Sequence, residues 1–510
     1  MPGISPTLCI MGFMSDLLFI AGNQLFEPRH LADHRRAVIV MCEDEDACSR
    51  LPYHQQKLGF VLAGMRRQAS TLRRAGFDVR YRTLTSGRSI EQAIIDTAME
   101  TGAVRLLRFQ TEDRGLANRL DRAAEHAGLH ARTLASPMFL LDDETLDAYF
   151  ESAKKPRMAA FYRSQRLRLG LLLEDDGQRP LGGRWSFDKD NRARLPARQA
   201  LPELPSVRHG ADIRQCLEEV AERFPDHPGD ARDLWLPVDR EGALAWLDDF
   251  LETRLTGFGT YEDALTTRSP TLFHSVLSPF LNAGLITPDE VVQRALDAGE
   301  ALRVPLNDLE GFLRQVVGWR EFMRGAYRQH RHTLRRRNVW GGERLLTERW
   351  LEGRTGLMPL DRAIGNALAL GWNHHIERLM VIANLMNLAE IEPREVYRFF
   401  MTHYIDAYDW VMVPNVYGMG LTSDGGIFTS KPYLCGSNYL RRMSDYPGGD
   451  WTDVVDGLYW RFVAKHRATL ATNPRLAVMV RALDRLESSR LRRIVGLAEN
   501  FIEETTRCAA

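Results

Sequence analysis

The hydrophobic pattern changes along the chain, and this change constrains the fold more than any other feature. Up to about residue 135, short apolar runs that suit buried strands alternate with segments of helical periodicity. From about residue 231, apolar residues recur almost throughout at intervals of three and four. The first pattern predicts an α/β domain built on a doubly wound parallel sheet, and the second predicts an all-α domain.

The residues between these two regions have a different composition. Residues 136–230 include a stretch rich in glycine, proline and charge, which is typical of a connector that wraps the surface. A chain of 510 residues is also too long for one ordinary core. We therefore predict an α/β domain at 1–135, a connector at 136–230 and a helical domain at 231–510.

Charge and cysteine content exclude several classes of protein. Lys and Arg (67) balance Asp and Glu (67), so any nucleic-acid surface must be a local patch. The six cysteines form no CxxC pair, which favours a reducing, cytoplasmic location over a disulfide framework. No apolar run reaches membrane-spanning length. The apolar N-terminus lacks a basic region, so we expect a buried strand there rather than a signal peptide, with Met11 or Met14 as alternative starts.

Polar residues follow two of the predicted strands. Asn23 lies in "AGNQL", and Glu43 and Asp44 lie in "MCEDED". Small molecules bind parallel sheets at the carboxyl ends of strands, so these residues are candidates for a ligand site. A solvated loop is the alternative.

The segment 261–288 combines hydroxyl side chains with a helix that starts at a proline. Ser275 and Ser278 are three residues apart and share a helix face if the helix has already begun. Hydroxyls and free N–H groups at a helix start suit a phosphate, although ordinary helix capping explains them as well.

A run of arginines within residues 319–338 forms a local basic stripe. It includes Arg328, Arg331 and Arg335, and no acidic residue follows Glu321. Such a stripe suits a nucleic-acid backbone, and the alternative is a solvated helix face.

Two adjacent histidines, His374 and His375, occur in "GWNHHIERLM", where we expect a buried helix. Neighbouring side chains on a helix point about 100° apart, so they cannot easily bind one ion, and we expect no metal. They can instead be core residues or proton donors. A histidine that faces a cavity while its neighbour packs behind it can act as a general acid.

Many longer motifs occur in order through nearly the whole chain. They include "YHQQKL", "FYRSQRLRLGLL", "GGRWSFDKDNR", "GTYEDAL", "LFHSVLSPFLNAGL", "FLRQVVGWREFMRGAY", "YIDAYDWVMVPNVYGMG" and "KPYLCGSNYLRRMSDY". Together they resemble the branch of the photolyase/cryptochrome superfamily that holds the prokaryotic (6-4) photolyases and the iron–sulfur bacterial cryptochromes.

The resemblance implies a fold and a light-driven reaction. An N-terminal antenna domain would precede a helical domain that holds a U-shaped FAD. Excited reduced flavin would give an electron to a (6-4) photoproduct that is flipped out of UV-damaged DNA, and the protein would act as a monomer. In this family the adjacent histidines lie at the lesion pocket, so His375 is the expected proton donor, with His374 supporting it.

The same resemblance assigns further residues. The expected FAD contacts are Tyr261, His274, Ser275, Leu277, Ser278, Trp319, Arg320, Arg378, Asp406 and Met412. The expected contacts of a ribityl-lumazine antenna are Asn23 and Glu43. The expected DNA contacts are Arg328, Arg331 and Arg335, which come from the basic stripe, and Tyr433.

The chain departs from the family at the cysteines that would hold an iron–sulfur cluster. Pro359, Pro447 and Asp450 occupy the region where relatives carry cluster ligands, and Cys435 is the only cysteine nearby. One thiolate cannot hold such a cluster, so we expect none. We expect direct packing to close the region, with Trp451 as a candidate plug.

Other departures concern the flavin. Phe399 and Phe400 replace redox-active aromatic residues, Met412 replaces a polar residue expected at flavin N5, and Asn23 replaces an acid. The leading hypothesis is a light-dependent lyase for (6-4) lesions. The alternatives are a cryptochrome-type blue-light photoreceptor without repair activity and a nucleic-acid-binding relic without photochemistry.

Overall fold

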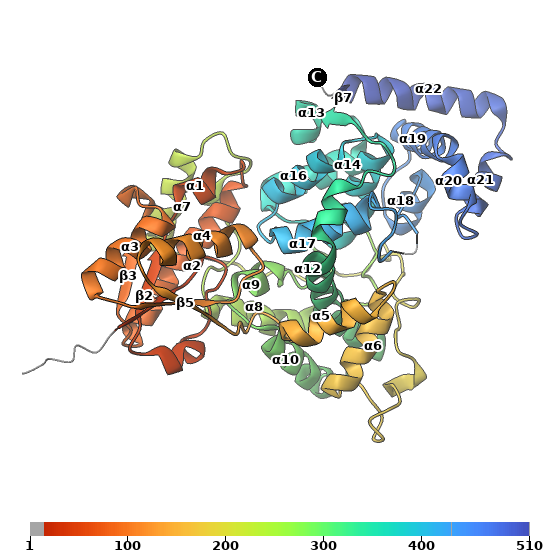
Figure 1. Cartoon of the computed structure of the whole chain (residues 1–510). Coiled ribbons are helices and arrows are strands. Elements are labelled where there is room, and N and C mark those ends of the chain that lie inside the picture. Colours follow the sequence, from red (N-terminus) through yellow and green to blue (C-terminus); the bar gives the residue numbers. More distant parts are fainter. Residues whose placement is uncertain (1–14, 430, 509–510) are drawn as a thin grey trace, which may run out of the picture. The chain divides into compact units, whose positions relative to one another are not determined.

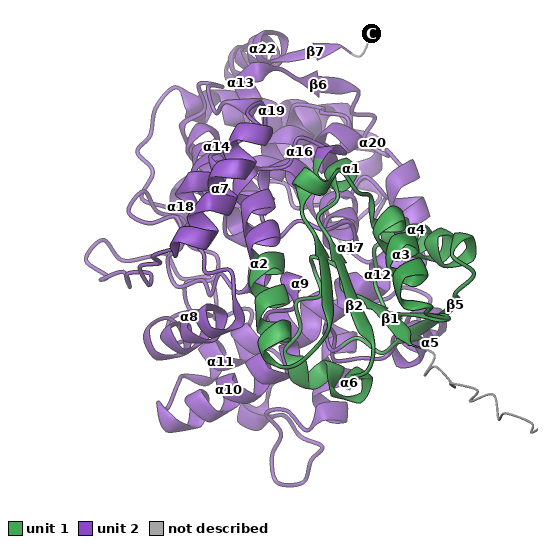
Figure 2. Cartoon of the chain, turned by 90° about the vertical axis from the view of Figure 1, so that its left-hand side faces the viewer, with its two compact units in different colours: residues 1–48, 64–136 green, residues 49–63, 137–510 purple. Residues whose placement is uncertain are grey.

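The structure is a computed structural model that describes residues 15–429 and 431–508 in two compact units (Figure 2). Unit 1 comprises residues 1–48 and 64–136, and unit 2 comprises residues 49–63 and 137–510. The stretch 49–63, placed in the first domain by the sequence, thus groups with unit 2. The candidate starts Met11 and Met14 lie outside the described residues.

Unit 1 contains the predicted parallel sheet. Its strands are β1 (Asp16–Phe19), β2 (Val38–Cys42), β3 (Val79–Arg82), β4 (Arg105–Phe109) and β5 (His130–Leu134). The strand order is β3-β2-β1-β4-β5, and every described neighbouring pair is parallel. In the central strand Leu17 lies opposite Val38 on one side and Leu106 on the other. The chain runs outward from β1 in both directions, which is the predicted doubly wound order.

Helices complete unit 1 (Figure 1). They are α1 (Glu45–Ser49), the later part of α2 (Gln55–Arg74), α3 (Ile90–Thr101) and α4 (Arg114–His126). Ser89 caps α3 by accepting a hydrogen bond from the Gln92 N–H, and Asp113 caps α4 in the same way. Apolar side chains of α3, such as Ile94, pack with Phe19 and Val40 of the sheet in one core.

Glu43 follows β2, as the sequence predicts, but its carboxylate is fully used inside unit 1. It accepts hydrogen bonds from Arg66 (2.7 and 3.0 Å), the Tyr81 hydroxyl (2.6 Å) and the Leu84 N–H (2.9 Å). This bonding accounts for a buried acid without a ligand. Asn23 is half-buried in the loop after β1. Antenna binding by these two residues stays a prediction.

Residues 136–230 are more ordered than the predicted connector. They contain α5 (Asp143–Ser152), α6 (Met158–Leu169) and α7 (Ala211–Arg223), with irregular chain between α6 and α7. Phe150 of α5 and Phe161 of α6 pack against Phe322, with ring centroids 5.2 and 5.7 Å apart. Helices α5 and α6 carry many polar residues, and only a few of their side chains enter the core of unit 2, so the sequence pattern does not separate them from the glycine- and proline-rich stretch.

The rest of unit 2 is helical, as predicted. Its α-helices between residues 240 and 413 are α8 (Arg240–Thr253), α9 (Ser278–Ala283), α10 (Pro288–Ala301), α11 (Leu306–Leu313), α12 (Glu321–Arg336), α13 (Glu348–Leu351), α14 (Met358–Leu370), α15 (Asn384–Leu388), α16 (Pro393–His403) and α17 (Asp409–Val413). The last are α18 (Ser437–Met443), α19 (Trp451–Lys465), α20 (Arg467–Ala471), α21 (Ala477–Leu483) and α22 (Ser488–Thr505). Strands β6 (Arg344–Leu346) and β7 (Thr506–Cys508) form an antiparallel pair. Over the described part of the chain, none of the helices combines the length and apolarity that a membrane span requires.

Three π-helical segments interrupt these helices. They are η5 (Arg314–Arg320), η6 (Glu377–Ala383) and η7 (Pro414–Gly420). A π-helix is rare and costs hydrogen-bond geometry, so it is found mostly where a functional site requires it. The sequence pattern did not reveal these segments, because an extra residue in one turn barely changes the apolar periodicity.

The predicted helix around the adjacent histidines is interrupted. Gly371 ends α14 in the left-handed conformation (φ 58°), and the next residues through His374 are irregular. Helical structure resumes at His375. The expectation of a continuous buried helix is therefore wrong, because a glycine at the C-cap lets the chain turn there.

Candidate functional site

Unit 2 encloses a cavity of about 820 Å³, and all three π-helical segments contribute to its wall. Most of the predicted FAD and histidine residues line it. These are His274, Ser275, Leu277, Ser278, Trp319, Arg320, His374, His375, Arg378, Asp406 and Met412. Tyr261 does not line the cavity and stacks on Phe273 instead (5.3 Å), whereas its neighbours Glu262 and Asp263 do line it.

The loop before α9 forms one side of the cavity in a strained conformation. Leu272 and Val276 have positive φ values of 46° and 56°, which cost of order 1–3 kcal/mol each for such residues. The Trp246 indole N–H bonds the Ser275 carbonyl (3.0 Å), and Arg254 bonds the His274 carbonyl (3.2 Å). Because α9 begins only at Ser278, the two serines do not share a helix face.

One part of the cavity wall, here called the floor, is formed by Arg378, Asp406 and Ser278. Arg378 of η6 donates two hydrogen bonds to Asp406, at 2.9 and 3.1 Å. The Ser278 hydroxyl donates to the same carboxylate (2.5 Å), so this serine orients Asp406 rather than standing free for a phosphate. Arg378 also lies 4.1 Å above the Tyr404 ring. A paired, stacked guanidinium in this position can stabilise an anionic ring system.

Two buried histidines stack beside this floor. The rings of His274 and His374 are 4.7 Å apart and nearly parallel, with an interplanar angle of 11°. Burial lowers the pKa of both well below the ordinary value, and nearby histidines, together with Arg378 in the case of His374, act in the same direction. Both are therefore neutral at physiological pH and can donate or accept one hydrogen bond through each ring nitrogen.

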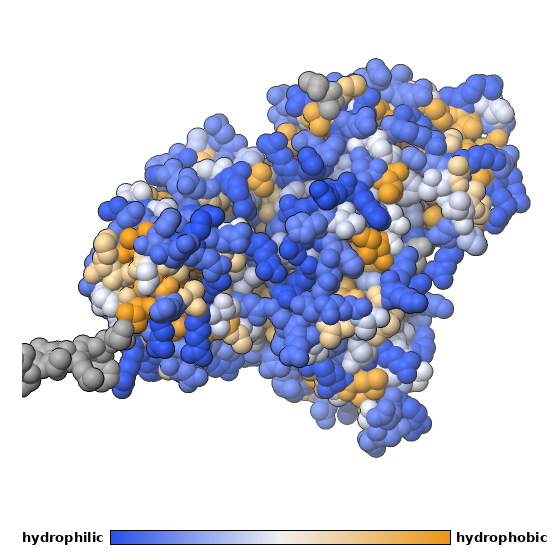
Figure 3. Space-filling view, viewed as in Figure 1, coloured by the Kyte–Doolittle hydropathy of each residue, from blue (hydrophilic) through white to orange (hydrophobic). Residues whose placement is uncertain are grey.

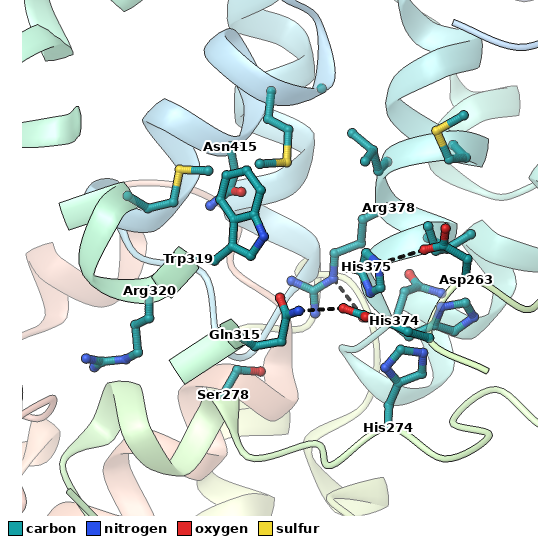
Figure 4. Close-up of a pocket in the computed structure, with 18 of the residues that line it drawn as sticks. Asp263, His274, Ser278, Gln315, Trp319, Arg320, His374, His375, Arg378 and Asn415 are labelled. Atoms are coloured by element: carbon teal, nitrogen blue, oxygen red, sulfur yellow. Dashed lines mark hydrogen bonds and ion pairs between the residues drawn. The ribbon is translucent and has the colours of Figure 1, made fainter. Parts of the chain in front are cut away.

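His375, the next residue, is much more exposed than His374. Its side chain is 46 % exposed, and its Nε2 lies 3.5 Å from the Asp263 carboxylate. Figure 4 shows the three histidines together on one side of the cavity, with Trp319 across from them. All three histidines line the cavity, and His375 is the exposed one, whereas His274 and His374 are buried. A role for His375 as general acid stays a prediction.

The opposite wall is aromatic and apolar. Arg320 donates to the Met138 carbonyl (2.7 Å) and stacks on Phe139 and Trp410, at 4.7 and 5.2 Å. Burial lowers its pKa to about 10, so it stays charged at physiological pH. Met412 is buried in α17 and contributes an apolar side chain.

Several buried polar atoms of the cavity wall have no hydrogen-bond partner within the described residues. They are His274 Nε2, His374 Nδ1, Arg320 Nε and Trp372 Nε1. Buried polar atoms are nearly always bonded, so orphans that gather in one cavity indicate a polar ligand. The cavity volume lies in the range of small-molecule and cofactor sites.

The outer part of the cavity, here called the mouth, is lined by residues that the sequence analysis had mostly missed. They are Arg192, Asp263, His375, Lys431, Tyr433, Tyr439 and Arg442. His375 was predicted as the proton donor and Tyr433 as a DNA contact, and the others lie within or beside the recognised motifs. Their motif membership was the available signal, but only folding brings these segments to one opening.

The predicted basic stripe lies on α12, and most of its charge is paired inside unit 2. Arg328 forms ion pairs with Asp143 (2.9 Å) and Asp147 (2.6 Å), and Arg335 pairs with Asp409. Arg331 bonds the Arg328 carbonyl (2.7 Å). A nucleic-acid contact through these arginines would have to compete with these ion pairs.

The region where the family resemblance predicts cluster ligands is filled by protein groups. Cys435 is buried, and its N–H and sulfur both bond Asn384, at 3.1 and 3.3 Å. Burial raises the pKa of this thiol, so it stays protonated. Trp451 is buried and donates to the Pro447 carbonyl (3.1 Å). Within the described residues, no group of three or more His, Cys, Asp or Glu side chains could hold a metal ion.

Comparison with known proteins gives the family. Residues 18–235 match the family model described as deoxyribodipyrimidine photo-lyase-related protein. Over 487 residues the chain is 33 % identical to the (6-4) photolyase of Agrobacterium fabrum, which covers 91 % of this chain and 94 % of that protein. The chain belongs to the photolyase/cryptochrome family.

Solved structures of this family share the fold. A bacterial class III photolyase from Agrobacterium tumefaciens matches 98 % of this chain and 100 % of its own, with a TM-score of 0.56 and 17 % identity. A cryptochrome from Synechocystis matches 96 % and 98 %, with a TM-score of 0.57 and 14 % identity. The predicted architecture, an α/β domain followed by a helical domain, is confirmed by this likeness.

Proposed function

We propose that this protein repairs (6-4) pyrimidine photoproducts in UV-damaged DNA by a light-dependent reaction with FAD. The observation that carries the proposal is the histidine pair, in which a buried neutral His374 stands behind an exposed His375 at one cavity. Similarity to a (6-4) photolyase over most of the chain supports it.

The cavity residues fit FAD. The orphaned polar atoms of His274, Arg320 and Trp372 would bond it, and the Arg378–Asp406 pair would face its ring system. When bound and reduced, FAD supplies an electron to the lesion after excitation by light and takes it back at the end of repair. The apolar Met412 cannot exchange a proton with the flavin, so any flavin protonation would need another route.

His375 would donate the proton that the lesion requires. Its exposed ring can reach a ligand at the mouth, and the Asp263 carboxylate, 3.5 Å from its Nε2, can orient the ring. His374 is stacked on His274 and buried, so its role would be to hold the backbone and ring of its neighbour in place. Extruding the damaged base costs a few kcal/mol, and least when pairing is already lost.

Two further features belong to the proposal. We expect no iron–sulfur cluster, because Cys435 is protonated and bonded to Asn384 and no other cysteine of the described residues lies in this region. A ribityl-lumazine antenna in unit 1 is proposed from family resemblance alone, as is a monomeric state.

The test is repair of an oligonucleotide with one (6-4) photoproduct by the purified, reduced protein under blue light. Chromatography would detect restored thymines, with a dark sample as control. His375→Ala should abolish repair but keep flavin photoreduction, whereas His126→Ala, at an exposed site in unit 1, should change neither. Absence of restored thymines with the wild-type protein, with flavin bound and photoreducible, would reject the repair function.

One observation favours a second function, that of a blue-light photoreceptor without repair. Phe400 lines the cavity and stacks on Tyr404 (5.5 Å), at a position where relatives carry a redox-active side chain. Phenylalanine is too hard to oxidise to relay electrons, so flavin photoreduction would follow another path. A wild-type protein that is photoreducible and inert toward the lesion would support this function.

A further inference from the structure

The end of unit 2 formed by α20, α21 and the N-terminal part of α22 is strongly basic. Residues 465–493 contain eight Lys or Arg and two acidic residues, in a chain whose total charge is balanced. Figure 1 shows these elements at one end of unit 2, and the outer rim of this end is hydrophilic in Figure 3. The excess charge is therefore a local property of this surface.

Some of these basic side chains form ion pairs with acidic residues, and others do not. Arg467 pairs with Asp484 (2.6 Å), Arg490 with Asp456 (3.5 Å) and Arg493 with Asp453 (2.7 Å). The remaining arginines are exposed, and their side chains make no hydrogen bond or ion pair with other described residues. We call them the C-terminal basic surface: Arg475, Arg481, Arg485 and Arg492.

The C-terminal basic surface is connected to the mouth of the cavity by one carboxylate. Asp456 of α19 accepts the Ser437 N–H at the start of α18 (2.9 Å) and also binds Arg490 of α22. Helix α18 carries Tyr439 and Arg442, which line the mouth. Asp456 of α19 thus ties α18, which carries mouth residues, to α22, which carries Arg492 of the C-terminal basic surface.

We propose that the C-terminal basic surface binds the phosphate backbone of the DNA duplex that flanks a base held in the cavity. This inference rests on the proposed function for its choice of DNA as partner. The open cations are all arginines, whose planar guanidinium matches phosphate oxygens with two hydrogen bonds. Such contacts position a duplex without reading its sequence.

The contrast with α12 explains why this surface, and not the predicted stripe, suits DNA. Arg328 on α12 already binds two carboxylates, so a phosphate must displace them. Arg481, Arg485 and Arg492 hold no carboxylate, so phosphate binding releases counterions at no cost in ion pairs. The C-terminal basic surface should therefore dominate the salt dependence of DNA binding.

The test compares the full-length protein with the variant Arg481→Gln/Arg485→Gln/Arg492→Gln. Fluorescence anisotropy would give Kd for an undamaged long duplex and for a short duplex of matched sequence, over a range of salt. The matched control is Arg114→Gln/Arg122→Gln/Arg132→Gln, which removes three exposed arginines of unit 1 that form no ion pair with other described residues. Circular dichroism and flavin content would show that both variants keep the fold.

The expected result is a loss of about 3 in the slope of log Kd against log salt, one per lost phosphate contact. At about 0.1 M salt, Kd for the long duplex should rise tenfold or more. The short duplex should be unaffected, and the control variant should match the wild type.

Three outcomes would overturn the proposal. One is an unchanged slope, the second is an equal loss in the control variant, and the third is an equal loss with the short duplex. Wild-type binding to phosphatidylserine vesicles that the variant loses, without any change for DNA, would assign the surface to a membrane. Because undamaged DNA is the probe, failure of lesion repair would leave this result unaffected and would count only against the proposed function.

Discussion

The floor and the mouth of the cavity hold their polar groups in different ways. On the floor, Arg378, Asp406 and Ser278 satisfy one another, and buried neutral histidines stack beside them. At the mouth, the exposed His375 lies 3.5 Å from the Asp263 carboxylate, which is longer than the contacts on the floor. The difference teaches that the floor is preorganised to hold a cofactor, whereas the mouth stays open to a ligand that completes its contacts.

The largest expected effect comes from breaking the floor. Arg378→Met leaves Asp406 buried without its cation, which should cost about 3 kcal/mol of unfolding free energy and most of the bound flavin. All ten tryptophans lie in unit 2, so tryptophan fluorescence during urea unfolding reports this unit. The control Arg232→Met breaks an exposed pair with Asp230 and should leave the midpoint unchanged. Equal effects of the two variants would contradict the comparison.

The next effect depends on pH and on Glu377, whose carboxyl is buried behind the floor. It accepts hydrogen bonds from Asn373 (2.6 Å) and Asn366 (3.1 Å), and burial raises its pKa to about 7. The folded state therefore holds this proton more tightly than the unfolded chain. Its stabilising contribution is complete below about pH 4.5 and is lost as pH rises to about 7, a change of about 3 kcal/mol.

Glu377→Gln removes this titration without changing the shape of the side chain. The wild type should lose stability relative to the variant between pH 5 and pH 8, as measured by urea unfolding at both values. Buried His54 and His403, with pKa values lowered to about 4, act in the opposite direction but equally in both proteins. A stability difference that is independent of pH would show that Glu377 ionises normally.

The two histidines give a smaller and more selective effect. His374→Ala removes a buried ring stacked on His274 and should cost about 1–3 kcal/mol, with a lower flavin content. His375→Ala removes an exposed ring and should leave unfolding and flavin content unchanged while repair is lost. Paired measurements of stability and repair separate the two roles. Similar losses of stability in both variants would show that floor and mouth do not differ in this way.

The smallest effect is expected for Asp263→Asn at the mouth. The variant keeps the size of the side chain but removes the charge 3.5 Å from His375 Nε2. Repair should slow a few-fold, while the unfolding midpoint and the flavin spectrum stay as in the wild type, because exposed ion pairs contribute little to stability. Repair rates under saturating light give the measurement. A large loss of stability would place Asp263 in the floor network instead.

Much of the site could be predicted from the sequence because family motifs keep their order. Residues such as His274, Trp319 and Asp406 line one cavity, as expected. Tyr261 of the motif "GTYEDAL" was expected to contact FAD but stacks on Phe273, and Ser278 bonds Asp406 rather than standing free. A motif gives the position of a residue along the chain, whereas the direction of its side chain depends on its packing.

The charges were predicted less well than the fold. The arginines of α12 form a stripe in the sequence, but the acids that neutralise them lie in α5 and α17, far away along the chain. The sequence pattern did not identify the C-terminal arginines as a binding surface, because their lack of ion pairs depends on which acids folding brings near them. Pairing between distant charges cannot be read from a local pattern.

By itself, the sequence determined the parallel sheet, the helical region and the family, because apolar periodicity and motif order are local properties of the chain. Only the tertiary structure decided which residues share the cavity, where π-helices interrupt the helices, and which of two adjacent histidines is buried. The physical reason is that burial and charge pairing are set by contacts between distant segments. His374 and His375 have the same chemistry, and the turn after Gly371 gives them opposite surroundings.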